Sequence, residues 1–444
     1  MDRRQALQTI GGLTAVVGFA GCLKDAAPQS AQADIETREI AESETTSQWL
    51  MAGHDPRGSG YNPAVELTEP TEPAWSVTLD VERRPSECVI DDNRMYAGVS
   101  NYEEVPATTR IEARTLSDGT VEWSKSLPYS VVDPPAIGRG PDNEQTLFVA
   151  SSQDHSNTGP GQGSVFAFDP ATGEELWEQP LGAKLGGIVV AEDAVVVTTT
   201  AINTIAVHVL DAATGEKRFS KESDRLHNTP TVYDGDIYFS TAREKLAAVS
   251  LSDGELLWET DTRADDTRPV VDWYRDLVYM GHRLGLEAFD RDTGEQVWNH
   301  VATEESTPIE DWLGMRDEPV VMEDQLVVRT QDTSDFNVGD IGHCYGIDPK
   351  TGEKTWELPE GRPGSSIVGA GDHAVLRRGD SASSMDVRQF VETMDGTAGL
   401  VAVDTEGSLS WELRGQWRPI AVSDAGLVVY QESEDIVDIG FFEL

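Results

Sequence analysis

One phrase recurs along this chain: an apolar run leads into Asp or Ser, a Gly turn follows, and an aromatic residue closes the unit. The clearest copies are residues 167–177 (AFDPATGEELW), 209–219 (VLDAATGEKRF), 249–258 (VSLSDGELLW), 288–298 (AFDRDTGEQVW) and 346–356 (GIDPKTGEKTW). Each copy is typical of a β-hairpin, because Asp and Gly form the tight turn and the flanking apolar residues alternate. A hairpin in every unit of roughly 40 to 55 residues predicts a β-propeller with four strands in each blade.

The other half of each unit is a second strand pair with an acidic turn, as in residues 89–96 (VIDDNRMY), 231–239 (TVYDGDIYF) and 320–328 (VVMEDQLVV). We expect these pairs to be strands A and B of a blade, and the hairpins to be strands C and D. The aromatic residues expected on the D strands are Trp75, Trp123, Trp177, Phe219, Trp258, Trp298, Trp356 and Trp411.

The two ends of the chain are complementary. The last three strands, near residues 419–424, 426–431 and 436–443, lack a D strand, whereas residues 74–79 form a D strand with no A, B or C strand before it. The sequence therefore predicts an all-β, eight-bladed propeller of four-stranded antiparallel blades whose ring is closed by the N-terminal strand, so that no sheet edge stays unpaired. Seven blades with one degenerate unit is the alternative.

The N-terminus is typical of a targeting segment. Arg3 and Arg4 precede a short apolar stretch at residues 10–20, which resembles a twin-arginine signal peptide. The run Phe19-Ala20-Gly21-Cys22 resembles a lipobox, which predicts lipidation of Cys22; a chance cysteine after a secretion signal is the alternative. We expect residues 1–22 to be the signal, residues 23–47 a disordered acidic tether and residues 48–444 the propeller, exported and anchored to the outer face of the cell membrane.

The charge balance is strongly acidic. The chain has 79 Asp and Glu against 34 Lys and Arg, which gives a net charge of -45. The acids are spread over every unit, which is typical of a surface that stays hydrated in concentrated salt, as in halophilic archaeal proteins. An acidic patch for a basic partner is the weaker alternative. A nucleic-acid partner is not expected, because its phosphates require a basic stripe.

Cysteine, histidine and serine patterns predict no catalytic residues and no metal site. Cys88 and Cys344 fall on well-separated blades, so we expect two buried thiols and no disulfide. The histidines have no ligand spacing, and no Gly-x-Ser-x-Gly turn is present. Residues 332–340 (DTSDFNVGD) depart from the calcium-loop pattern and are expected to be a solvated acidic loop.

The repeated phrase, together with residues 49–63 (WLMAGHDPRGSGYNP), resembles the pyrroloquinoline-quinone (PQQ)-like repeat propellers. These include the quinoprotein alcohol dehydrogenases and the lipoprotein that scaffolds outer-membrane protein assembly in bacteria. The resemblance covers residues 49–444 and implies that the Gly and Trp of each repeat lock neighbouring blades together. These docking residues are Gly173, Trp177, Gly254, Trp258, Gly294, Trp298, Gly352 and Trp356.

The enzymes of this family carry an adjacent Cys-Cys ring over the quinone and a calcium ion beside a catalytic Asp. No Cys-Cys pair and no C-x-x-C-H haem motif occur in this sequence. The cofactor is therefore left unknown, with PQQ not favoured.

One pattern indicates a ligand site. Propeller topology places the D-to-A connections at the mouth of the central channel, and nearly all of them carry a cation, which predicts a ring that binds an anionic ligand or a carboxylate of a partner. The alternative is that these cations neutralise nearby acids. The predicted ring residues are Arg84, Lys184, Arg225, Arg268, Arg316, Arg362 and Arg418.

The longer B-to-C loops, at residues 101–110, 153–163, 331–342 and 377–396, are expected on the same face as this ring. We therefore expect a monomeric, lipid-anchored scaffold that binds a protein or a small anionic ligand without catalysis. The alternatives are a PQQ- or calcium-dependent oxidoreductase of alcohols or sugars, and an extracellular sensor of a small anionic solute.

Overall fold

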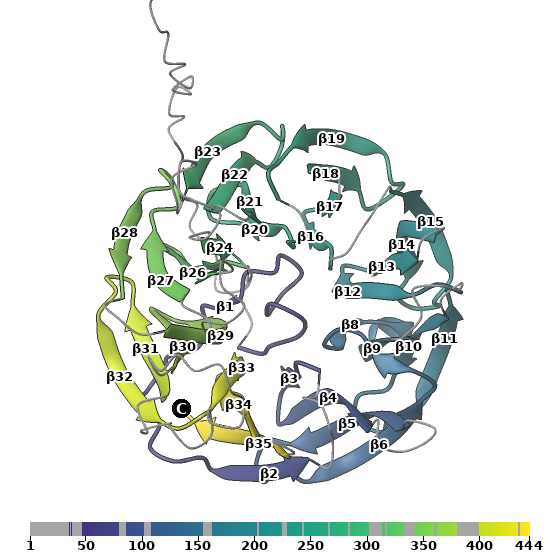
Figure 1. The fold of residues 1–444 in the computed structure, drawn as a ribbon. Coiled ribbons are helices and arrows are strands. Elements are labelled where there is room, and N and C mark those ends of the chain that lie inside the picture. The colour runs from purple at the N-terminus through teal and green to yellow at the C-terminus, as the bar shows by residue number, and fades with distance from the viewer. Residues whose placement is uncertain are drawn as a thin grey trace, which may run out of the picture.

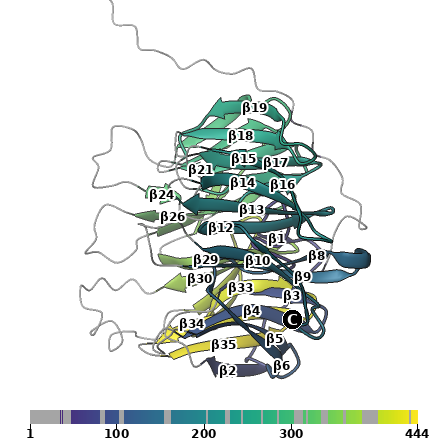
Figure 2. The ribbon, with the colours of Figure 1, turned by 90° about the vertical axis from the view of Figure 1, so that its right-hand side faces the viewer.

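A computed structural model describes residues 35, 37, 47–79, 86–101, 108–153, 162–201, 204–223, 229–241, 244–264, 267–282, 285–301, 313–315, 318–332, 342–358, 362–379, 399–433 and 436–444. These residues form an eight-bladed β-propeller, as the repeats predict (Figure 1). The strands run between the two faces of the ring (Figure 2), and each blade is an antiparallel sheet whose strands A to D lie in order from the channel to the rim. In blades 2 and 6 strand A consists of two short strands, which both pair with strand B. The described part of the chain has no helix with the length and hydropathy of a membrane span.

The strand bounds follow the repeat. Blades 1 to 4 are β3–β6 (Val89–Asp91, Arg94–Asn101, Thr108–Thr115, Val121–Leu127), β7–β11 (Ser130–Val131, Ala136–Arg139, Gln145–Ser152, Gly163–Phe168, Glu175–Pro180), β12–β15 (Leu185–Ala191, Ala194–Ala201, Thr204–Asp211, Lys217–Glu222) and β16–β19 (Thr231–Tyr233, Asp236–Thr241, Lys245–Ser250, Leu256–Asp261). Blades 5 to 7 are β20–β23 (Val270–Asp272, Leu277–His282, Gly285–Asp290, Gln296–Val301), β24–β28 (Leu313–Met315, Val320–Val321, Leu326–Asp332, Gly342–Ile347, Lys354–Glu357) and β29–β32 (Arg362–Ala370, His373–Gly379, Gly399–Asp404, Leu409–Arg414).

Blade 8 joins the two ends of the chain, as predicted. Its first three strands are β33 (Arg418–Ser423), β34 (Gly426–Ser433) and β35 (Ile436–Glu443), and its outermost strand is β2 (Trp75–Leu79). Trp75 pairs with Phe441 and Leu79 with Val437, so β2 runs antiparallel along β35. The ring is therefore closed by hydrogen bonds between segments that lie at opposite ends of the sequence.

The Gly turn of each repeat contacts the blade before it. Gly294 has a φ of 71°, which a Gly adopts without strain, and a Cβ placed there would lie 2.5 Å from the ring of Trp258. The Trp258 indole donates a hydrogen bond of 2.9 Å to the carbonyl of Arg291, three residues before that glycine. Trp123, Trp177 and Trp298 meet Gly173, Gly215 and Gly352 in the same way, and Trp356 meets Gly407 but donates to the carbonyl of Thr405, two residues before it. Each Trp thus docks on the Gly of the following repeat.

Two junctions depart from this arrangement. Phe219 packs on Gly254 but has no indole N–H to donate. Trp411 is buried with its Nε1 unpartnered among the described residues, because strands C and D of the next blade come from opposite chain ends and no Gly turn joins them. The hydrogen bond between neighbouring blades therefore requires both an indole on one blade and a C-to-D hairpin turn on the next.

Replacing Phe219 with Trp is expected to raise the free energy of unfolding by about 0.5–1.5 kcal/mol, because the new indole N–H would reach the carbonyl of Leu251 as the other indoles reach theirs. Urea unfolding of the two proteins measures the change. The matched control is Trp177→Phe, which removes the 3.1 Å bond to the carbonyl of Ala212 and should lower stability by a similar amount. Equal stability of all three proteins would show that the indole bond contributes nothing.

Candidate functional site

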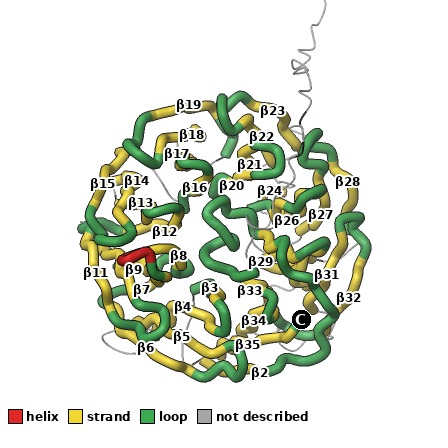
Figure 3. The backbone as a smooth tube through the Cα atoms, turned by 180° about the vertical axis from the view of Figure 1, so that it is seen from behind, coloured by secondary structure: helices red, strands yellow, loops and turns green. Residues whose placement is uncertain are grey.

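The central channel is crossed by the chain's own N-terminal segment, here called the plug (residues 47–64). Figure 1 shows it in purple inside the ring of blades, and Figure 3 shows it as a loop across the channel from the opposite side. It contains only one short strand, β1 (Tyr61–Asn62), which lies parallel to β29. The sequence pattern pointed to these residues only as part of a family resemblance, and their role in the channel was missed.

Backbone hydrogen bonds fix the plug to the ring. Its carbonyl oxygens accept N–H groups from the innermost strands or the turns beside them in seven of the eight blades, counted over the described residues. In chain order, Ser47, Trp49, Leu50, Pro56, Arg57, Ser59 and Gly60 accept from Asp424, Ile90, Ile137, Val232, Val271, Val321 and Gly369. The donors follow the order of blades 8, 1, 2, 4, 5, 6 and 7, so the plug runs around the inner circumference of the ring.

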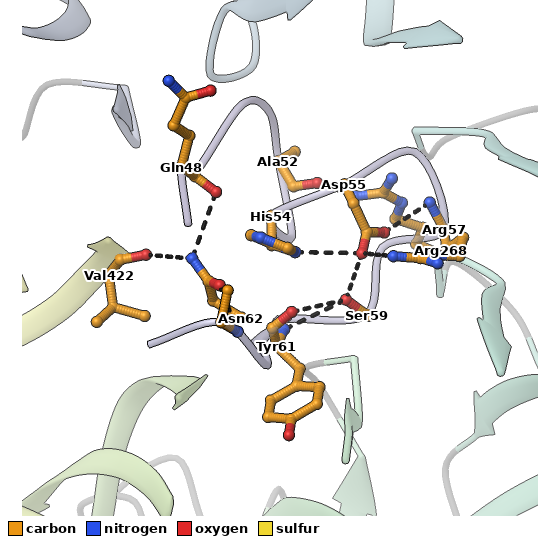
Figure 4. Close-up of polar contacts among 11 residues, drawn as sticks. Gln48, Ala52, His54, Asp55, Arg57, Ser59, Tyr61, Asn62, Arg268 and Val422 are labelled. Atoms are coloured by element: carbon orange, nitrogen blue, oxygen red, sulfur yellow. Dashed lines mark hydrogen bonds and ion pairs between the residues drawn. The ribbon is translucent and has the colours of Figure 1, made fainter. Parts of the chain in front are cut away.

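A buried carboxylate organises the plug. Asp55 accepts hydrogen bonds from the Arg57 Nη2 (2.7 Å), the Arg57 backbone N–H (2.8 Å) and the Ser59 hydroxyl (2.8 Å), and lies 3.2 Å from the Nδ1 of His54 (Figure 4). Burial alone would raise the pKa of the Asp55 carboxyl, but the Arg57 guanidinium and the hydrogen bonds hold that pKa well below its usual range. The Arg57 guanidinium carbon lies 3.2 Å from the centroid of the Trp273 ring, which joins the plug to blade 5.

Glycines let the plug fold tightly over Arg268. Gly53 and Gly58 have φ values of 66° and 67°, and a Cβ on Gly58 would lie 2.9 Å from the guanidinium carbon of Arg268. Arg268 is 5% exposed, and its Nη1 donates to the carbonyl of Ala52 at 2.9 Å. This predicted ring cation therefore contacts the plug backbone.

The plug divides the channel into two hollows. On the open face, where the D-to-A connections lie, it forms the floor of a cavity of about 640 Å³, here called the cup. The charged side chains of the cup, among the described residues, are Glu87, Asp133, Glu318 and Arg268. On the closed face, where the A–B turns lie, a second hollow of about 300 Å³ is lined by plug residues and by blades 3 to 5.

Asp133 is the carboxylate most enclosed by the cup. The Thr229 hydroxyl donates to it at 2.5 Å, which links the start of blade 2 to the start of blade 4. Burial raises the pKa of the Asp133 carboxyl, and the hydrogen bond from Thr229 opposes that rise. A deep carboxylate of this kind favours a hydrogen-bond donor or a cation as its neighbour.

The other predicted ring cations occupy different surroundings. Lys184 and Arg268 line a side hollow of the cup together. The Arg418 guanidinium lies over the ring of Tyr430 at 5.6 Å and donates to its hydroxyl at 3.3 Å. Arg84, Arg225 and Arg316 lie outside the described residues, and for Arg362 only the backbone, at the start of β29, is described.

Cys88 and Cys344 are both buried and unpaired, as expected. Among the described residues, no group of three His, Cys, Asp or Glu side chains is placed to hold a metal ion. Most of the long B-to-C loops lie outside the described residues, as do residues 1–34, which include the predicted signal and Cys22.

Comparison with known sequences gives matches to two kinds of propeller. The family model for the outer membrane protein assembly factor BamB matches residues 161–376. A 1-butanol dehydrogenase (quinone) of Thauera butanivorans is 32% identical over 157 residues, which are 33% of this chain and 24% of that enzyme. BamB of Kangiella koreensis is 27% identical over 197 residues, 44% of this chain and 38% of that protein. The aligned segment thus spans about a quarter of the length of the quinoprotein relatives.

Solved structures show the same fold at low identity. The quinohemoprotein alcohol dehydrogenase ADHIIG from Pseudomonas putida HK5 aligns with a TM-score of 0.65 at 13% identity, over 93% of this chain and 83% of that one. BamB from Moraxella catarrhalis aligns with a TM-score of 0.56 at 16% identity, over 84% of this chain and 98% of that one. By its repeats and its blades, the chain is an eight-bladed propeller that is similar to both the quinoprotein dehydrogenases and BamB.

Proposed function

We propose that this chain is a binding or assembly scaffold that acts without catalysis and recruits its partner at the open face of the propeller. The observation that carries the proposal is the cup, a blind hollow whose floor is built from the chain itself and held by backbone bonds to the blades. A rigid, closed-ended hollow presents a fixed shape to a partner and requires no ordering of the ring on binding. The matches to an assembly factor support the same function.

The site proposed for recognition includes the cup and the cations beside it. Lys184 reaches the side hollow, and Arg418 lies on the first strand of blade 8. The cup itself carries three carboxylates and one guanidinium among its described residues, so it favours a donor group or a cation of the partner. The predicted cations at the mouth would meet carboxylates at the partner's periphery.

For the setting of the scaffold, we propose export by the twin-arginine signal and lipidation at Cys22. The propeller would then be tethered by residues 23–47 outside the cell membrane, as a monomer with an acidic, salt-tolerant surface. Gln48 lies on the closed face, where its amide donates to Asp92 at 2.9 Å, so the tether would leave from this face. The cup would point away from the membrane.

The oxidoreductase alternative is supported by the matches to quinone-dependent alcohol dehydrogenases. The described residues of the cup do not fit PQQ, because this quinone carries carboxylate groups and would face Glu87, Asp133 and Glu318. Arg268, the one cation among the cup's described residues, donates from Nη1 to the carbonyl of Ala52 and from Nε to the Thr231 hydroxyl, which leaves its Nη2 as one unpartnered donor against three carboxylates. A small anionic solute, the ligand of the sensor alternative, would meet the same excess of carboxylates among the described residues of the cup.

A binding test and a cross-linking test separate these functions. We expect the mature protein, purified in high salt, to show neither saturable uptake of PQQ by absorbance nor quinone-dependent oxidation of alcohols, with or without added calcium. A photoreactive amino acid placed at Gln153, beside the cup, should cross-link one identifiable protein in intact cells. The same group at Leu257, on the outer rim, should not cross-link that protein. Quinone-dependent alcohol oxidation would overturn the scaffold.

A further inference from the structure

The closed face of the propeller carries a ring of exposed carboxylates. Each of the eight blades places at least one exposed carboxylate in the turn between strands A and B. These residues are Asp92, Asp142, Glu144, Glu192, Asp193, Asp234, Asp276, Glu323, Asp324, Asp372 and Asp424. Because A is the innermost strand of every blade, these carboxylates encircle the end of the channel that the plug closes.

Three arginines on this face, Arg57, Arg275 and Arg291, are largely shielded from solvent, whereas Arg139 beside the turn of blade 2 is exposed. The Arg275 side chain is 1% exposed and pairs with Asp272 at 2.7 Å. The Arg291 side chain is 12% exposed and lies 3.2 Å from Asp276 and 3.6 Å from Asp234. The Arg57 guanidinium is held by Asp55 and Trp273. The groups presented to a partner are therefore mainly carboxylates.

An apolar hollow lies inside this ring. The plug lines it with Leu50, Met51, Pro56 and Pro63 and with the ion-paired Asp55 and Arg57 beside His54, and blades 3 to 5 line it with Ala191, Val232, Tyr233 and Trp273. Glu192 and Asp234 also line it and are exposed. The volume of about 300 Å³ is large enough for one Leu, Met or Phe side chain. Filling such a hollow removes apolar surface from water, and the two acids at its edge attract a positive charge beside the inserted group.

We propose that the closed face is a second docking surface, which binds a segment of another protein that carries one large apolar residue flanked by Lys or Arg. The apolar side chain enters the hollow, and the flanking cations face Glu192, Asp234 and the neighbouring turns. Charge complementarity selects a protein segment over a small organic cation, because the carboxylates extend over all eight blades and only an extended basic partner meets them together. This surface lies on the side of the ring opposite the cup.

The test uses the mature protein and a fluorescent peptide, GKRLRKG, whose binding is followed by anisotropy. We expect saturable binding that weakens about tenfold or more when the central Leu is replaced by Gly, because the apolar contact is lost. The peptide GQQLQQG, without cations, should also bind at least about fivefold more weakly. Equal affinity for the Leu and Gly peptides would overturn the proposal, because it would reduce the contact to unspecific attraction between charges.

Protein variants locate the site. Glu192→Gln with Asp234→Asn should weaken GKRLRKG binding at least about fivefold, whereas Glu222→Gln with Asp261→Asn, which removes two exposed acids from outer strands, should leave it unchanged. Ala191→Leu should abolish binding by filling the hollow, and Ala191→Ser should keep it. All variants are checked for an unchanged melting temperature. The same loss with both pairs of neutralised acids would contradict a localised site.

Discussion

Replacing Asp55 with Ala is expected to lower the free energy of unfolding by about 3–5 kcal/mol, because the Arg57 guanidinium would stay buried without its carboxylate. Asp55 is 6% exposed and also accepts the hydroxyl of Ser59 and the backbone N–H of Arg57, so three donors would lose their acceptor together. Guanidinium or urea unfolding of the wild type and the variant measures the loss. The matched control is Asp424→Ala, which removes an exposed carboxylate of the same face and should change stability by less than about 0.5 kcal/mol.

The loss should depend on pH with a definite sign. The pKa of Asp55 is lower in the folded protein than the usual 3.8, so its ionised form stabilises the fold fully above that value. Below it, the unfolded chain binds a proton that the folded chain does not, and this stabilisation falls by about 1.4 kcal/mol per pH unit. The difference between wild type and Asp55→Ala should therefore be constant near neutral pH and narrow below about pH 4. A difference that grows on acidification would contradict the charge assignment.

A chain that begins at residue 80 is expected to lose its cooperative unfolding transition. This truncation removes β2, which is the outermost strand of blade 8, and the plug, whose carbonyls accept backbone N–H groups from seven described blades. The loss of these hydrogen bonds, at about 0.5–1.5 kcal/mol each, and of the buried side chains of Trp49, Tyr61 and Trp75 is comparable with the whole stability of an ordinary domain. Circular dichroism on heating and limited proteolysis measure the outcome.

The control for this truncation is a chain that begins at residue 47, which keeps every described contact of the plug and of β2. It should melt at the temperature of the mature protein. A cooperative transition of the same midpoint in the chain that begins at residue 80 would show that the ring closes without its N-terminal segment.

The fold was predictable because its signals are local and repeated. The hairpin ending in Trp258 or Trp298 carries its own turn, and Asp290 accepts the backbone N–H and the hydroxyl of Thr293 within four residues. The closure by β2 followed from counting strands, because one D strand at the start and three strands at the end make one blade. The partner of each Trp was not predictable from one repeat, since its glycine lies in the next.

The site was harder to predict for a physical reason. The plug residues contact seven of the eight blades, among the described residues, through one or two backbone hydrogen bonds each, so they need neither an alternating pattern nor a fixed spacing. The clustered Gly53, Gly58 and Gly60, together with buried Trp49 and Tyr61, are the signal that marks a tight, enclosed segment. The sequence predicted that Arg268 lies in a D-to-A connection. The direction of its side chain could not be predicted, because it is set by a hydrogen bond to the plug carbonyl of Ala52. The cations at the mouth remain a prediction.

The plug has a consequence for how such a protein changes over evolutionary time. Repeat proteins gain and lose units by duplication and deletion of one segment, and each unit added to a ring widens it. Here the N-terminal segment spans the inside of the ring from blade 8 round to blade 7, with its acceptors spaced to meet seven blades in turn. If a blade were added or lost, most of these plug carbonyls would no longer lie opposite the N–H groups that donate to them. The length and acceptor spacing of the plug therefore fit a ring of eight blades. A change in the number of blades requires a matching change in the plug, which lies in a distant part of the chain.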